Sequence, residues 1–131
     1  MSTRAIIGIE LEKFGKILGA WQWNDGGNMT EEFLNKHFHT LETASKLVSV
    51  GMWGAMYTLK EKEEFETLCD NNNIPRPLFV EVEGVYLSTQ SHYKDRKPIF
   101  YKDYEQVKCQ DVRYTYIFDK DTCKWKKRRT I

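Results

Sequence analysis

The chain has 131 residues, of which 40% are hydrophobic and 30% are charged, and its net charge is +1. These totals are typical of a single folded domain spanning residues 1–131. They exclude a charged disordered chain, and no apolar run approaches the ~20 residues of a membrane span. Three widely spaced cysteines, Cys69, Cys109 and Cys123, indicate reduced thiols rather than a disulfide framework.

The first quarter of the chain alternates between apolar and other residues, which predicts two strands, over residues 4–12 and 16–23. Gly15 lies between them and suits the turn of a β-hairpin. Trp21 and Trp23 are two residues apart, so we expect both indoles on the same face of the second strand.

The run Asn-Asp-Gly-Gly at residues 24–27 interrupts this alternation. A helix is predicted from Asn28, which stands three residues before Glu31 as in a capping box. A second helix is predicted from an offset at Thr40, and Gly51 suits its C-terminal cap.

The rest of the chain continues this mixed pattern. We expect a loop or short strand over 52–59, followed by a surface helix over 60–73. One strand is predicted over 78–88, with a bulge at Gly84. Residues 99–108 fit either a strand end or one helical turn, and residues 112–118 and 123–128 are predicted to form a hairpin. Strands at both ends with helices between them predict an α+β fold. We expect an antiparallel sheet of about four to six strands, with two or three helices packed on one face.

The turn before the first helix is a candidate ligand site. Gly26 and Gly27 have no Cβ, so their backbone amides can approach a ligand, and the following helix start favours a phosphate or carboxylate. An indole nearby can stack a nucleobase. The candidate ligand-binding residues are Arg4, Trp21, Trp23, Asp25, Gly26, Gly27 and Asn28. The alternative is a purely structural turn, because this composition is common turn chemistry and the Asp25 carboxylate repels anions.

A second candidate surface is the basic C-terminus. Residues 120–131 hold six basic residues and one acid. For nucleic acid, the candidate contacts are Lys124, Lys126, Lys127, Arg128 and Arg129. The alternative is a solvated basic segment without a partner.

Catalytic motifs are absent from the sequence. It contains no GxSxG nucleophile elbow, no P-loop Lys-Ser or Lys-Thr after the glycines, and no His or Cys spacing suited to a metal. We therefore expect a protein that is not an enzyme and that needs no cofactor and no metal.

Four short motifs resemble a family of small bacteriophage proteins with an MSTR-type N-terminus and a Trp-Asp-Gly-type turn. The matching pieces are Ser2–Ile9, Trp23–Gly27, Leu47–Gly51 and Tyr114–Phe118 followed by Trp125. The chain departs from the family at Gln22, where histidine is frequent, and in the extra Asn24. The resemblance implies a phage protein in the host bacterial cytoplasm.

The resemblance and the candidate site lead to three functional hypotheses. The favoured one is a protein that counters host antiviral defence as a sponge for a small nucleotide signal of the cyclic or ADP-ribose type. The second is a protein-binding inhibitor of a host defence complex, of the anti-CRISPR type. The third is a small nucleic-acid binder acting through the basic C-terminus. Homo-oligomerisation is a further hypothesis, because nucleotide sponges often form shared pockets and sheet edges invite pairing.

Overall fold

The structure is a computed structural model that describes residues 3–12, 15–90, 93 and 96–130, and it describes the backbone of Asn28 but not its side chain. It contains four helices and nine strands in its described part. In chain order these are β1 (Ala5–Glu10), β2 (Ile17–Gln22), α1 (Asn28–His37), α2 (Leu41–Val48), β3 (Met52–Trp53), β4 (Met56–Tyr57), α3 (Leu59–Asn71), β5 (Leu78–Val82), β6 (Val85–Thr89), β7 (Ile99–Tyr101), α4 (Tyr104–Lys108), β8 (Tyr114–Asp119) and β9 (Lys124–Arg129).

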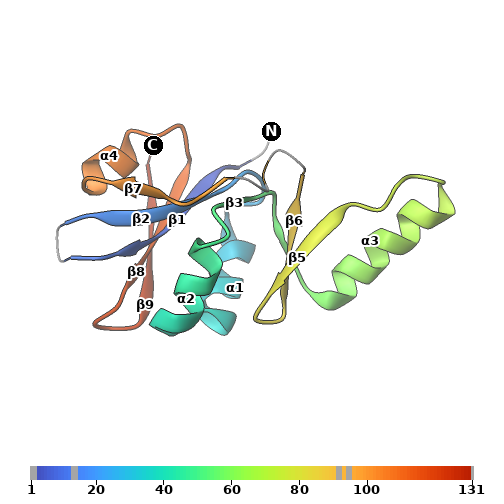
Figure 1. Cartoon of the computed structure of the whole chain (residues 1–131), viewed down its shortest axis with the longest axis horizontal. Coiled ribbons are helices and arrows are strands. Elements are labelled where there is room, and N and C mark those ends of the chain that lie inside the picture. The colour runs from blue at the N-terminus through green and yellow to red at the C-terminus, as the bar shows by residue number, and fades with distance from the viewer. Residues whose placement is uncertain (1–2, 13–14, 91–92, 94–95, 131) are drawn as a thin grey trace.

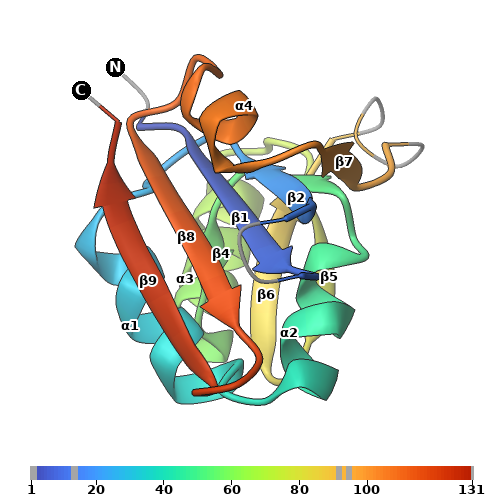
Figure 2. The same ribbon diagram turned by 90° about the vertical axis from the view of Figure 1, so that its left-hand side faces the viewer.

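The strands form two sheets. The large one has the order β3-β2-β1-β8-β9, with β7 also pairing with β2, and the small one has the order β4-β6-β5. Figure 2 shows β9 as an outer strand, followed by β8, β1 and β2. The predicted α+β class is confirmed. The large sheet is mixed, because β1 pairs in parallel with β8, and β2 with β3, while the other pairings are antiparallel.

Both faces of the large sheet are covered. One face packs against α1 and α2, and the buried residues there include Ile7, Leu34 and Leu47. The other face carries a smaller apolar cluster with Tyr101 of β7 and Val107 of α4. Two helices, α1 and α2, thus pack on one face as predicted, whereas α4 packs with β7 on the opposite face.

The small sheet and α3 project from this body as a separate arm at one end of the long axis (Figure 1). The inner face of β6 is buried in the main core through Val85 and Leu87. Its other face meets α3 through the Lys62 ammonium, which lies 5.4 Å from the ring centre of Tyr86. The helix buries only Cys69 among its residues, in keeping with the predicted surface helix. None of the described helices is long and apolar enough to span a membrane.

Local structure departs from the sequence predictions at two places. Residues 78–88 form not one bulged strand but a hairpin, because Glu83 and Gly84 both have positive φ, 50° and 80°, as a two-residue hairpin turn requires. The cap of α1 is Gly27 rather than Asn28, and it provides no side-chain hydrogen bond. The Thr40 offset is confirmed, since Thr40 forms a capping box at the start of α2.

Candidate functional site

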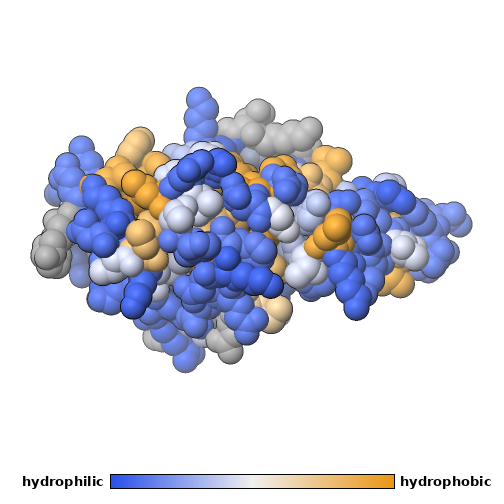
Figure 3. Space-filling view, turned by 90° about the horizontal axis from the view of Figure 1, so that it is seen from below, coloured by the Kyte–Doolittle hydropathy of each residue, from blue (hydrophilic) through white to orange (hydrophobic). Residues whose placement is uncertain are grey.

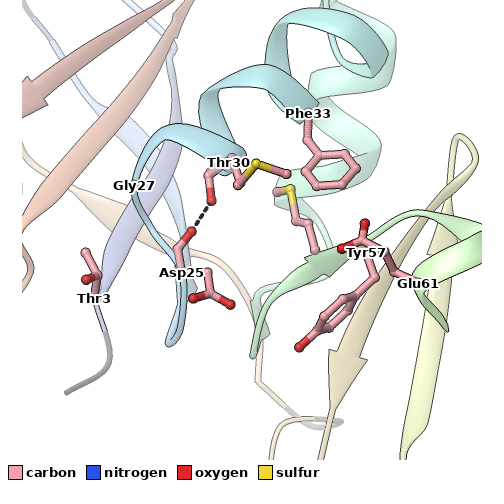
Figure 4. Close-up of a pocket in the computed structure, with 9 residues that line it drawn as sticks. Thr3, Asp25, Gly27, Thr30, Phe33, Tyr57 and Glu61 are labelled. Atoms are coloured by element: carbon pink, nitrogen blue, oxygen red, sulfur yellow. Dashed lines mark hydrogen bonds between the residues drawn. The ribbon is translucent and has the colours of Figure 1, made fainter. Parts of the chain in front are cut away.

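The turn at residues 24–27 is held from inside the core by a buried amide. The Gln22 side chain is fully buried, and its amide nitrogen lies 2.8 Å from the carbonyl oxygen of Asn24 and 2.7 Å from Oγ1 of Thr30. Its amide oxygen accepts from the indole nitrogen of Trp53 at 2.8 Å. Thr30 in turn donates to the carbonyl oxygen of Asp25 at 2.6 Å. These contacts fix the turn to the first turn of α1 (Figure 4).

Gln22 holds the turn in place, whereas its sequence context indicated only a departure from the family pattern. The sequence signal that could have identified this role is the position of Gln22 in the strand. It alternates with Trp21 and Trp23, so it faces the core, and a polar side chain at a core-facing position needs buried partners.

The two glycines have different surroundings. The Gly26 amide already donates to the carbonyl oxygen of Thr3 at 2.9 Å, and a Cβ on Gly26 would lie 2.9 Å from Cβ of Ala5. A Cβ on Gly27 would have nothing within 4 Å. Among the described residues, none accepts a hydrogen bond from the amide of Gly27. Gly26 is therefore a packing residue, and Gly27 is the open one.

A buried tyrosine holds both glycine carbonyls from behind. The hydroxyl of Tyr116 lies 2.6 Å from the carbonyl oxygen of Gly26 and 2.8 Å from that of Gly27. Burial, with the negative charge of Glu31 as a smaller cause, raises the pKa of Tyr116 well above its usual range. The hydroxyl therefore stays protonated and remains a donor to the turn.

A cavity of about 280 Å³ opens at the start of α1, between that helix and the α3 arm. We call it the α1 pocket. Its apolar wall consists of Met29, Phe33, Met56 and the ring of Tyr57. Its polar lining consists of Thr3, Asp25, Gly27, Thr30 and Glu61. Figure 4 shows Asp25 and Thr30 on the α1 side and Tyr57 and Glu61 on the facing side.

The electrostatics of the α1 pocket favour hydrogen-bond donors. Burial and the carboxylates of Asp25 and Glu61 together raise the pKa of Tyr57. The Tyr57 hydroxyl therefore stays neutral in the field of these two negative groups. Since carboxylates accept N–H bonds and repel phosphate, an N–H-rich or cationic group fits between Asp25 and Glu61 better than an anion does.

The indoles lie elsewhere, on the face of the large sheet that α4 covers. The rings of Trp21 and Trp23 are 5.6 Å apart, and the Trp21 indole nitrogen donates to the Tyr101 hydroxyl at 2.8 Å. The Arg4 guanidinium lies 5.0 Å from the ring centre of Trp23 and 2.6 Å from a carboxylate oxygen of Asp111. None of these residues lines the α1 pocket.

Five of the seven candidate ligand-binding residues therefore fall into two separate groups. Asp25 and Gly27 line the α1 pocket, while Arg4, Trp21 and Trp23 cluster on the opposite face of the sheet. Gly26 belongs to neither group and packs against Thr3 and Ala5. The side chain of Asn28 lies outside the described part of the chain. The sequence analysis did not single out Phe33, Met56, Tyr57 and Glu61, because they come from other segments that only the fold brings to the turn.

The basic C-terminal residues occupy β9, an outer strand, and alternate between its faces. Arg128 lies over the ring of Tyr104 at 4.3 Å on the α4 side, whereas Lys127 lies over the ring of Tyr114 at 4.7 Å on the α1 side. Lys124, Lys126 and Arg129 are exposed. The run is thus divided between two faces of one strand, and Lys126 and Arg128 line a cavity on the α4 side that also contains carboxylates, among them Asp103 and Asp119.

No group of three or more His, Cys, Asp or Glu side chains in the described residues is arranged to hold a metal ion. Comparison of the chain with protein-family models, curated proteins and solved structures finds no match.

Proposed function

We propose that this protein is a non-enzymatic binding protein whose ligand is a small nucleotide, with the nucleobase in the α1 pocket. The observation that carries the proposal is the pairing, in one cavity, of an aromatic and thioether wall with two carboxylates. A cavity of about 280 Å³ lies just below the usual range for ligand pockets, so it accommodates one ring system rather than a whole dinucleotide.

The carboxylates supply the preference for the base. The exocyclic amino groups of adenine, guanine and cytosine donate hydrogen bonds, and Asp or Glu side chains accept them. Phe33 and Tyr57 offer ring faces, on which bases stack at about 1–3 kcal/mol each. Asp25 and Glu61 then read the amino edge of a base that lies against these rings.

The phosphate belongs at the edge of the pocket rather than between the carboxylates. The free amide of Gly27 stands at the start of α1, where the helix dipole favours negative charge. A ligand with its base inside the α1 pocket and its phosphate at this helix start contacts both the carboxylates and the free amide.

The resemblance to small bacteriophage proteins gives this binding a biological setting. We propose that the protein acts in the cytoplasm of the host bacterium, where it sequesters a cyclic or ADP-ribose-type nucleotide signal of an antiviral defence. A sponge of this kind must bind its ligand but need not catalyse a reaction. This requirement suits a site that combines a cavity for one ring system with fixed polar groups.

Isothermal titration calorimetry with cyclic di-GMP, cyclic di-AMP and ADP-ribose tests the proposal, and UMP, whose base has no exocyclic amino group, serves as the control. We expect heat from at least one amino-bearing ligand and none from UMP. Asp25→Asn and Glu61→Gln should each lower the affinity about 10- to 100-fold, the loss of a hydrogen bond to a charged group. No heat with any of the three ligands would overturn the proposal.

These variants are chosen to keep the fold. Asn tolerates the positive φ of 55° at Asp25, and Gln can replace Glu61 in the capping box of α3. Glu64→Gln is the matched control, since Glu64 is exposed on α3 and does not line the α1 pocket. Equal affinity in all three variants would place the ligand elsewhere.

A second candidate function is inhibition of a host defence protein by direct binding. It is favoured by exposed apolar side chains on α3, where Phe65 and Leu68 are 45% and 61% exposed. A pull-down from host lysate in which Phe65→Ser and Leu68→Ser abolish capture of one stoichiometric partner would support this function over the nucleotide sponge.

A further inference from the structure

Two edge strands of the fold, β5 and β9, lie toward opposite ends of the molecule. In the described part of the chain, no strand pairs with the outer side of β5 in the small sheet or of β9 in the large sheet. Figure 1 places β5 and α3 toward one end of the long axis and β9 toward the other. An open edge offers unpaired backbone N–H and C=O groups to another strand.

The two edges carry opposite charge. All residues of β9 except Trp125 are basic, which gives the strand a charge of +5. Residues 59–84, which hold α3 and β5, contain seven acidic and three basic residues. Like charges placed opposite one another destabilise a strand pair, so two β9 edges repel each other, whereas β9 and the acidic arm attract.

The β5 edge also lacks the usual protection against pairing. It has no lysine or arginine within the strand, and Leu78 and Val80 are 51% and 39% exposed. Natural edge strands are commonly blunted by lysines, as β9 is. Figure 3 shows hydrophobic side chains among hydrophilic ones at the end of the molecule that carries α3. The arm thus combines an open edge, apolar side chains and negative charge.

We propose that β9 of one copy of this chain adds to β5 of a second copy, so that the protein associates head to tail. Side-chain alternation permits an antiparallel register in which Glu81 lies opposite Lys126 of the neighbour. In the same register Phe79 meets Arg128 and Val82 meets Trp125. One carboxylate oxygen of Glu81 already accepts from the Gly84 amide, and the other oxygen has no partner among the described residues.

The symmetry follows from the positions of the edges. Because the contact joins two different surfaces, it is heterologous and leaves one β5 edge and one β9 edge free in each pair. Association therefore continues to a ring or an open chain. It rests on the edges alone and does not depend on a ligand in the α1 pocket.

Sedimentation velocity of the full chain over a range of concentrations tests the proposal. We expect mass to rise with concentration at about 50 mM salt and to fall back toward the monomer at about 500 mM, because salt screens the attraction between exposed charges. A wild-type protein that stays monomeric at every concentration and both salt levels would overturn it.

Charge reversal separates this contact from other pairings. The variant Lys126→Glu/Arg129→Glu makes β9 less basic, and Leu78→Lys/Glu81→Lys makes β5 basic. All four positions are exposed. Each double variant alone should be monomeric. An equimolar mixture of the two should associate again, since the unchanged β5 of the β9 variant then meets the unchanged β9 of the β5 variant.

Restored association also shows that both variants are folded. The matched control is Lys36→Glu/Lys108→Glu, which makes the same charge change at exposed helix ends and should associate like the wild type. If the β9 variant alone associates as the wild type does, β5 pairs with another β5 and the proposal is wrong. A mixture that stays monomeric also contradicts it.

Discussion

Replacing each glycine of the turn by alanine tests the structural argument directly. The change at Gly26 should lower the stability of the fold, whereas the change at Gly27 should weaken ligand binding. In Gly26→Ala the new Cβ lies 2.9 Å from Cβ of Ala5 and 3.0 Å from the carbonyl oxygen of Thr3. Both neighbours belong to the start of β1 or the segment just before it, so backbone must shift. Overpacking of this kind costs about 2–3 kcal/mol of unfolding free energy. For a domain of this size that is a fall in Tm of roughly 6–15 °C.

Gly27→Ala should leave stability nearly unchanged but weaken binding. Its Cβ meets nothing within 4 Å, so the cost is about 1 kcal/mol, that of a poorer N-cap residue. The added methyl group points into open space at the α1 pocket, where it obstructs a ligand. Differential scanning calorimetry with ligand titration measures both effects. Equal loss of stability in the two variants, or a fully stable Gly26→Ala, would refute the packing assignment.

Two further predictions concern the buried polar groups behind the turn. Burial raises the pKa of Tyr116, so its contribution to stability is complete below the ordinary tyrosine pKa of 10.0 and is lost as pH rises above it. Chemical unfolding from pH 8 to about 11 should show a fall that Tyr116→Phe reduces; an identical fall in both proteins would contradict this. Gln22→Leu should cost at least about 2 kcal/mol, because the Trp53 indole N–H loses its acceptor. A double-mutant cycle with Trp53→Phe should show coupling between the two, and additive losses would argue against the buried bond.

Sequence patterns predicted the local elements well, because the signals for those elements lie within a few residues. The β1–β2 and β8–β9 hairpins follow from strict alternation, and the start of α2 follows from Thr40. The parallel contact of β1 with β8 joins Ala5 to Tyr114, more than a hundred residues away, and no local pattern encodes it. The hairpin at Gly84 was mistaken for a bulge because a single glycine in a strand fits either structure.

The candidate site was predicted in part for the same reason. The sequence located the turn at Asp25 and Gly27, which line the α1 pocket. It did not provide the opposite wall, since Tyr57 and Glu61 reach the turn only through the placement of β4 and α3. Proximity in sequence also suggested that the indoles and the glycines share a site. Gln22 faces the core and anchors the turn, so its neighbour Trp23 must face the other way.

The placement of Trp23 yields a test that separates the α1 pocket from a site built on the indoles. The Trp23 indole nitrogen is buried and has no hydrogen-bond partner among the described residues. Trp23→Phe loses some apolar area but also removes this unsatisfied donor, so we expect stability to change by less than about 1 kcal/mol. Ligand affinity should stay within about twofold, whereas Tyr57→Leu, which removes a wall of the α1 pocket, should lower it about tenfold. If Trp23→Phe abolishes binding and Tyr57→Leu does not, the ligand stacks on the α4 face beside Arg4 and the α1 pocket is not its site.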